Sequence, residues 1–367
     1  MSTETGLMKV KNCKKQIKDR DFYVDVAKGI GIFFVVWGHI ILHGPVYNFI
    51  YSFHMPLFFL LSGLLFNISK YKTLKEFCVH RCKTLIIPYL IFSFITYIYW
   101  AIIENPITDN EEILNPFLQI FISQGSGGYM LHNIPMWFVL CLFAIEIIYF
   151  ILKKKLNNKL LFIACCLLGI IGCAMTLPNT FFDFKKLVWS IDVALIAIPF
   201  YMIGNLINEK FGRTKVKQLI LNKKVISIII MIILFVLLCI LSNINSPISM
   251  GTEELGNWFL FYLNAFIGIV MILIISVIME KNKILQFLGR NSFFIMAMHF
   301  PTRKPIVLII SKIFSVSMDY VYNSPLYSFI VAILTMIVNI IMIIILEKIK
   351  SKYKEKMKGN LQWKKEF

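Results

Sequence analysis

The chain has 367 residues, of which 58% are hydrophobic and only 16% are charged, and its mean hydropathy is +0.74. A soluble globular protein has about a quarter charged residues. The composition therefore excludes an ordinary soluble domain and predicts that lipid surrounds most of the chain. The net charge of +18 suggests a nucleic-acid ligand until the positions of the Lys and Arg residues are considered.

Residues 1–23 are polar and basic, with no apolar core of a cleaved signal peptide. Because a membrane span needs roughly 20 mainly apolar residues, the sequence then predicts an all-α integral membrane fold of about ten transmembrane helices. Their ranges are 24–44, 46–68, 83–103, 133–152, 160–178, 187–207, 225–242, 257–279, 286–300 and 325–347. The apolar run 305–311 is either a continuation of the ninth span or a re-entrant piece. We expect one transmembrane domain over 24–347 and a basic tail over 348–367, because the longest connection, 104–132, is shorter than the roughly 50 residues of a small domain.

The basic residues are distributed unevenly between the two sides of the predicted membrane domain. Of the 38 Lys and Arg residues, 32 fall on one side, in 1–23, 69–83, 153–159, 208–224, 280–290 and 348–367. The other side holds Lys185, Lys186, Arg303, Lys304 and Lys312. The positive-inside rule therefore predicts that both termini are cytoplasmic. Topology and anionic lipid explain the charge, and no nucleic-acid partner is expected.

The eight cysteines lie on the predicted cytoplasmic side or within spans, so we expect no disulfide among them. Cys78 and Cys82 flank His80, but the second ligand pair of a closed zinc site is missing, and we predict no metal. His43, His80 and His132 are expected in loops and receive no role.

The first predicted span contains three ionisable residues, Asp25, Lys28 and His39. Each is costly in lipid, by about 2.5–3.5 kcal/mol near the bilayer centre. At 100° per residue, Lys28 and His39 are three turns plus about 20° apart, and Asp25 and His39 four turns less about 40°, so all three share one helix face. His54 opens the second span at a similar depth and could face the same cavity. Pro56 follows it and removes a backbone donor.

These two spans resemble the opening of the acyltransferase-3 family of integral membrane O-acyltransferases, and the Lys-Gly form resembles its fucose 4-O-acetylase-like branch. The resemblance rests on Asp25 to His39 and on the run Phe53-His54-Met55-Pro56-Leu57-Phe58-Phe59-Leu60-Leu61-Ser62-Gly63. Family members carry Arg or Lys, then ten residues, then His, which Lys28 and His39 match. A third block, Arg81 to Tyr89, resembles the family's basic cluster, although Thr84 takes the place of the usual second Arg. Weaker matches lie at Met136-Trp137-Phe138 and from Gly289 to Pro301.

The resemblance implies a multi-pass plasma-membrane enzyme that passes an acyl group, acetyl or succinyl, from cytoplasmic acyl-CoA to a hydroxyl of an extracytoplasmic or cell-surface carbohydrate. His39 would be the catalytic residue, as general base or as nucleophile. Lys28, Arg81 and Lys83 would bind the CoA phosphates. The distance from Lys28 to His39 along the helix is about 16.5 Å, close to the length of a pantetheine arm. Candidates for lining the cavity or contacting substrate are Asp25, His54, Ser62, Trp137, Glu146 and His299.

Each residue also has a structural explanation. His39 would pack between helices, Lys28 would extend to the membrane interface, and Arg81 and Lys83 would serve only to orient the segment in the membrane.

The main alternative function is an exporter or flippase for a polysaccharide or lipid-linked sugar, which an inverted repeat would favour; we see no such repeat. A third alternative, a sensory or scaffolding membrane module, would need an attached soluble domain, and the sequence predicts none. The acceptor stays open among capsule, wall polymer and lipid-linked glycan. Other glycan-biosynthesis proteins are expected partners, and the Lys, Ile and Asn richness suggests a bacterium.

Overall fold

The computed structural model describes residues 21–108, 112–123, 130–177, 187–245 and 247–363. Within these residues the protein is helical and has no β-strand, apart from one isolated bridge between Ser249 and Glu254. The helices are α2 (Phe22–Gly38), α3 (Pro45–Tyr51), α4 (His54–Leu65), α5 (Leu74–Arg81), α6 (Ile87–Tyr99), α7 (Asn105–Thr108), α8 (Leu114–Ile122), α9 (Trp137–Lys155), α10 (Asn158–Ala174), α11 (Ile191–Lys210), α12 (Gly212–Asn222), α13 (Lys224–Ile244), α14 (Trp258–Ile278), α15 (Lys283–Arg290), α16 (Ser292–Phe314), α17 (Met318–Asn323) and α18 (Pro325–Trp363). Short π-helical turns, Cys82–Ile86 and Trp100–Glu104, join α5, α6 and α7 into one long segment.

Eight segments of the described chain are long and apolar enough to cross a membrane. They are Pro45–Leu65, Leu74–Ile107, Ile134–Lys155, Val188–Lys210, Lys224–Ile244, Trp258–Ile278, Ser292–Phe314 and Pro325–Tyr353. The first and fifth predicted spans correspond to α2 and α10, which have 17 residues each. The protein is therefore an all-helical membrane protein, and the count of ten spans stays a prediction.

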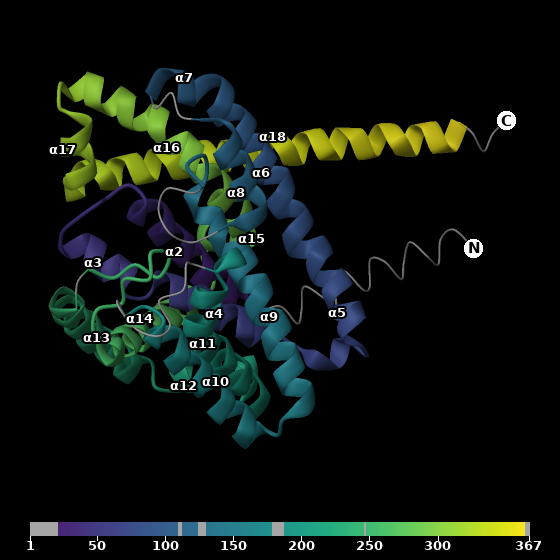
Figure 1. Ribbon diagram of the computed structural model, residues 1–367, viewed down its shortest axis with the longest axis vertical. Coiled ribbons are helices and arrows are strands. Elements are labelled where there is room, and N and C mark those ends of the chain that lie inside the picture. The colour runs from purple at the N-terminus through teal and green to yellow at the C-terminus, as the bar shows by residue number, and fades with distance from the viewer. Residues whose placement is uncertain (1–20, 109–111, 124–129, 178–186, 246, 364–367) are drawn as a thin grey trace.

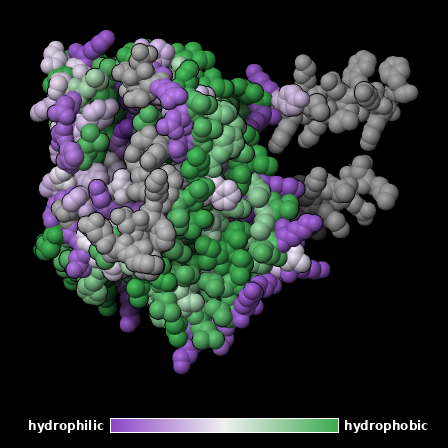
Figure 2. Space-filling model, in the orientation of Figure 1, coloured by the Kyte–Doolittle hydropathy of each residue, from purple (hydrophilic) through white to green (hydrophobic). Residues whose placement is uncertain are grey.

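The apolar surface is what a lipid-embedded bundle requires. Large hydrophobic side chains such as Ile102 and Val225 are 70% and 71% exposed. Figure 2 shows that apolar residues form a broad belt across the molecule, while polar residues gather toward its left and right edges. In Figure 1, α3 and α17 lie at the left end of the bundle, α5 lies at the right, and α18 runs across and extends beyond the other helices.

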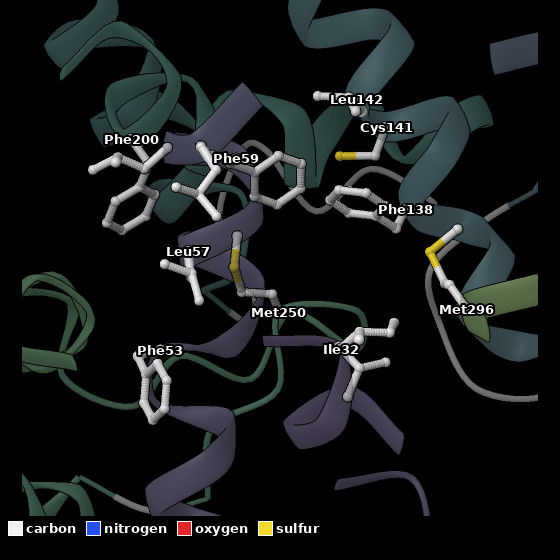
Figure 3. Packing of buried hydrophobic residues seen from close by; sticks show 14 of the residues in the cluster. Ile32, Phe53, Leu57, Phe59, Phe138, Cys141, Leu142, Phe200, Met250 and Met296 are labelled. Carbon is white, nitrogen blue, oxygen red and sulfur yellow. The ribbon is translucent and has the colours of Figure 1, made fainter. Parts of the chain in front are cut away.

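Helix α2 is central to the bundle and contacts α4, α14, α15, α16 and α18. Glycines allow the closest approaches between backbones. A Cβ at Gly289 of α15 would collide with the Asp25 carbonyl of α2, and one at Gly63 of α4 with the Tyr201 carbonyl of α11. Small residues at such crossings are the usual means of packing helices in lipid. Larger side chains fill the remaining interior, where the rings of Phe59 and Phe138 pack 4.9 Å apart between α4 and α9 (Figure 3).

The predicted boundaries of the ninth span are wrong. Asn291 separates α15 from α16, and α16 continues through Pro301 and Pro305 to Phe314. The run 305–311 is therefore a continuation and not a re-entrant piece. Pro301 leaves the Ala297 carbonyl without its helical donor, and the side-chain amide of Asn133 donates to that oxygen at 2.8 Å. This bond lets the helix pass the proline within the membrane.

The second predicted span is two helices, because a turn at Ser52 and Phe53 separates α3 from α4. Pro56 lies in the first turn of α4, where a backbone N–H has no helical partner in any case. Pro56 therefore helps to begin α4 and does not break a hydrogen bond in the middle of a helix. His80 also differs from expectation, since it lies on α5 and not in a loop.

Candidate functional site

A cavity of about 170 Å³ lies between α2, α4, α9 and α16. We call it the central cavity. It is mainly apolar, and Lys28, His39 and Ser62 are among the polar residues on its walls. Its lining comprises Lys28, Ile32, Val35, His39, Met55, Phe58, Ser62, Pro135, Trp137, Phe138, Leu142, Ser292, Phe293 and Met296.

A second cavity of about 350 Å³ adjoins the first and is here called the basic chamber. It shares Lys28, Ser62 and Leu142 with the central cavity. Its lining is Lys28, Ser62, Leu65, Phe66, Asn67, Lys70, Tyr71, Phe77, His80, Arg81, Leu85 and Leu142. The two Lys and one Arg make this end of the path suited to an anion.

A third cavity of about 240 Å³, the aromatic chamber, adjoins the other end of the central cavity. It shares His39, Met55 and Trp137 with it. Its lining is Gly38, His39, Leu42, Tyr47, Tyr51, His54, Met55, Ile134, Trp137, Ser249, Met250, Gly251, Thr252, Phe300 and Arg303. The three cavities thus adjoin one another in a series from Arg81 to Arg303, here called the path, with Lys28 on the wall shared by the first two and His39 on the wall shared by the last two.

Lys28 and His39 lie on the same helix and line the same cavity. His39 is the C-terminal cap of α2, where its backbone N–H still bonds to the Val35 carbonyl at 3.1 Å. The helix therefore fixes the distance between the two side chains, and the end of the helix at His39 opens the imidazole to both the central cavity and the aromatic chamber.

His299 comes from α16 and faces His39. The two ring centroids are 5.3 Å apart. His299 is fully buried, and its Nδ1 lies 3.0 Å from the Ile295 carbonyl, which makes Nδ1 the donor. Its Nε2 has no hydrogen-bond partner among the described residues. His54 is also buried, lines the aromatic chamber, and has Nδ1 at 2.8 Å from the Ile50 carbonyl.

Ser62 and Trp137 mark the two ends of the central cavity. Ser62 lines its junction with the basic chamber, and its hydroxyl donates to the Phe58 carbonyl at 2.8 Å. Trp137 lines its junction with the aromatic chamber, where Gly251 packs against the indole. Both side chains therefore lie where a ligand passing along the path would touch them.

Of the predicted site residues, Asp25, Lys83, Glu146 and His299 line none of the three cavities. Arg81 lines the basic chamber, but its guanidinium pairs with the fully buried Glu146, which lines none of the three cavities. Lys83 is exposed on the π-helical turn after α5 and lines none of them either. Asp25 is buried at the crossing with Gly289, away from the walls.

Among the residues on the path that the sequence did not identify are Lys70 and His80 in the basic chamber, and Tyr51 and Arg303 in the aromatic chamber. Arg303 could have been found, because it lies four residues after His299 and so on the same face of a helix. Lys70 gave no signal, since its position depends on the short 3₁₀ turn Ile68–Lys70 after α4.

No three His, Cys, Asp or Glu side chains come together as metal ligands within the described part of the chain. Cys78 and Cys82 are free thiols there. The ionisable side chains on the path include Lys, Arg and His. The Lys and Arg side chains suit a phosphate-bearing ligand in the basic chamber, and the imidazole of His39 suits proton transfer beside the central cavity.

Comparison with known proteins assigns the chain to a family. Residues 21–344 match the family model Acyl_transf_3, described as an acyltransferase domain. Neither a curated protein nor a solved structure matches the chain. The matched range contains every residue on the walls of the three cavities. The chain therefore belongs to the acyltransferase-3 family, and the protein is a membrane acyltransferase.

Proposed function

We propose that the protein transfers an acyl group, acetyl first among the candidates, from acyl-CoA in the basic chamber to a hydroxyl of a carbohydrate in the aromatic chamber. The observation that carries the proposal is the series of three adjoining cavities, with Lys28 and His39 on the walls that they share. Acyl transfer between two separated ligands needs a site that both can reach, and His39 lines both cavities that meet there.

The basic chamber supports binding of the CoA phosphates. Lys28 and Lys70 line it together with Arg81. The guanidinium of Arg81 also pairs with Glu146, so its positive charge is partly compensated. Lys83 is exposed outside the chamber, so we give it no role in CoA binding. Its positive charge contributes to the orientation of this segment in the membrane.

The central cavity supports passage of the thioester arm. Lys28 and His39 are eleven positions apart, or about 16.5 Å along the helix at 1.5 Å per residue. A pantetheine arm of this length brings its thioester to His39 while the nucleotide stays in the basic chamber. The walls between them, including Ile32, Val35 and Phe58, are apolar and exclude water that would hydrolyse the thioester.

Two reaction schemes fit His39. As a general base it takes the proton of the sugar hydroxyl, the oxygen attacks the thioester carbonyl, the C–S bond breaks, and the imidazolium returns the proton to the leaving thiolate. As a nucleophile it first forms an acyl-imidazole with release of CoA, and the hydroxyl then takes the acyl group. In both schemes the products are an ester and free CoA.

The same proposal places the basic chamber and both termini in the cytoplasm of a bacterial cell and the aromatic chamber toward the outer face. The excess of basic residues on one side and the resemblance to the fucose 4-O-acetylase-like branch support it. Acceptors include capsule, wall polymer and lipid-linked glycan, made together with other glycan-biosynthesis proteins. An exporter or flippase is less favoured, because the sequence shows no internal repeat and the spacing of Lys28 and His39 has no special meaning under that hypothesis.

The test compares ester content of the surface glycan in cells that express the intact protein, His39→Ala or His43→Ala. His43 is an exposed histidine that lines none of the three cavities, so its variant controls for loss of an imidazole. We expect His39→Ala to reduce ester content at least about 100-fold with membrane insertion unchanged, and His43→Ala to match the intact protein. Equal ester content in all three would rule out the proposed chemistry.

A further inference from the structure

Arg303 occupies an unusual position in the aromatic chamber. It lies one helical turn beyond His299 on α16, and its guanidinium stacks over the Phe300 ring with 4.2 Å between Cζ and the ring centroid. The stacking holds the planar group in place. Arg303 and His39 line the same chamber. A ligand that binds Arg303 therefore lies near His39.

The charge of Arg303 is not compensated by the described residues. Its Nε is buried and has no hydrogen-bond partner there. Its neighbour Lys304, in contrast, pairs with Glu104, and Arg81 at the other end of the path pairs with Glu146. Glu253 and Glu254 belong to the loop that covers the aromatic chamber, but neither lines it.

A partly buried guanidinium without a carboxylate is costly, because desolvation of a charge is repaid only by an opposite charge and by hydrogen bonds. Arg also offers a planar fork of donors that matches a carboxylate or a phosphate. Building on the proposed function, we propose that the aromatic chamber is the acceptor subsite and that it selects an anionic glycan, whose carboxylate or phosphate binds Arg303.

The rest of the chamber fits a sugar ring beside that anion. The rings of Tyr47 and Tyr51 stack with centroids 4.0 Å apart, and the Trp137 indole lies at the junction with the central cavity. Aromatic faces accept the apolar face of a sugar, while phenol and indole groups offer hydrogen bonds at the edge. Ser249 and Thr252 add short polar side chains from the loop.

The competing role for Arg303 is stabilisation of the oxyanion that forms on the thioester carbonyl. The two roles differ in what they predict. An acceptor subsite binds anionic glycans without any acyl donor, whereas an oxyanion group contributes only during the reaction. A binding measurement therefore separates them.

The experiment measures binding of three oligosaccharide probes of matched length to the full-length protein in lipid nanodiscs, without acyl-CoA. Oligogalacturonate carries carboxylates, oligo(glycerol phosphate) carries phosphates, and a dextran oligosaccharide is neutral. The variants are Arg303→Gln, Arg303→Lys and the control Lys312→Gln, which removes a charge from an exposed position of the same helix.

We expect at least one anionic probe to bind about tenfold more tightly than dextran, and Arg303→Gln to weaken that probe by about tenfold to 100-fold with dextran unaffected. Lys312→Gln should match the intact protein. Arg303→Lys should retain a phosphate ligand better than a carboxylate ligand, since Lys acts as a point charge. Comparison of the phosphate and carboxylate probes therefore identifies the anionic group that Arg303 binds.

Equal binding of dextran and both anionic probes, binding of none of them, or equal losses in Arg303→Gln and Lys312→Gln would overturn the inference. Failure of the proposed acyl transfer has a different signature. In that case His39→Ala would leave ester content unchanged, whereas the binding of anionic probes would still depend on Arg303.

Discussion

The imidazoles of His39 and His299 lie 5.3 Å apart between their centroids, one on the last turn of α2 and the other fully buried on α16. The buried Nε2 of His299 has no partner among the described residues. Since buried polar atoms are almost always hydrogen-bonded, this nitrogen would be available to the reacting groups if His39 acts as proposed. His299 is therefore placed to orient His39 or to share its proton.

The first prediction concerns that pair. Replacing His299 with Phe keeps a ring of similar size but removes the nitrogen, and kcat for acyl transfer should fall about 100-fold while KM for acyl-CoA stays unchanged. Steady-state kinetics on membranes with equal protein content provide the measurement. His299→Asn, which retains a polar group, should recover part of the rate. A variant His299→Phe with normal kcat would show that the pair is only a packing contact.

The second prediction concerns the ion pair of Arg81 and Glu146. Glu146 is fully buried, so Glu146→Gln leaves a guanidinium without its counter-charge and should cost about 3 kcal/mol in the free energy of unfolding. Thermal unfolding in detergent measures the effect. Glu209→Gln is the control, because the pair of Glu209 with Lys153 is more exposed and should contribute less than about 1 kcal/mol. Equal stability of both variants would contradict the prediction.

The third prediction concerns the junction at Ser62. This small residue lines both the basic chamber and the central cavity, so Ser62→Trp should obstruct the path and lower acyl transfer at least about tenfold. Binding of acyl-CoA, measured by displacement of a labelled analogue, should persist because the basic residues are untouched. Ile233→Trp on the exposed face of α13 controls for the added indole. Undiminished transfer in Ser62→Trp would mean that the acyl group takes another route.

The fourth prediction concerns pH. His132 lies in the turn before α9 and is buried, which lowers its pKa from 6.5 to about 4. The folded state thus binds fewer protons than the unfolded state between these values, so stability is full above about pH 6.5 and falls as the pH drops toward 4. The loss should be about 2 kcal/mol at about pH 5. Thermal unfolding across this range should show a weaker pH dependence in His132→Phe, and an identical dependence would contradict the assignment.

The sequence allowed prediction of what depends on composition and on position along one helix. The prediction that Lys28 and His39 line one cavity required only the 3.6-residue period of the helix. The apolar runs were enough to predict most of the long helices. The pairing of Arg81 with Glu146 was not predictable, because it joins α5 to α9 across 65 positions. Likewise, the continuation of α16 past Pro301 depends on Asn133, a distant residue whose amide takes the freed carbonyl.

In the proposed reaction, the apolar walls of the central cavity would limit the leak of ions across the membrane. Ile32, Val35, Phe138 and Met296 line the central cavity between the two more polar chambers, and apolar walls of this kind disfavour a continuous file of water. A neutral acyl group on a thin arm can pass, whereas protons and metal ions meet an electrical barrier. If the proposed function holds, the enzyme would thus connect a cytoplasmic donor to an outer acceptor without discharging the membrane potential.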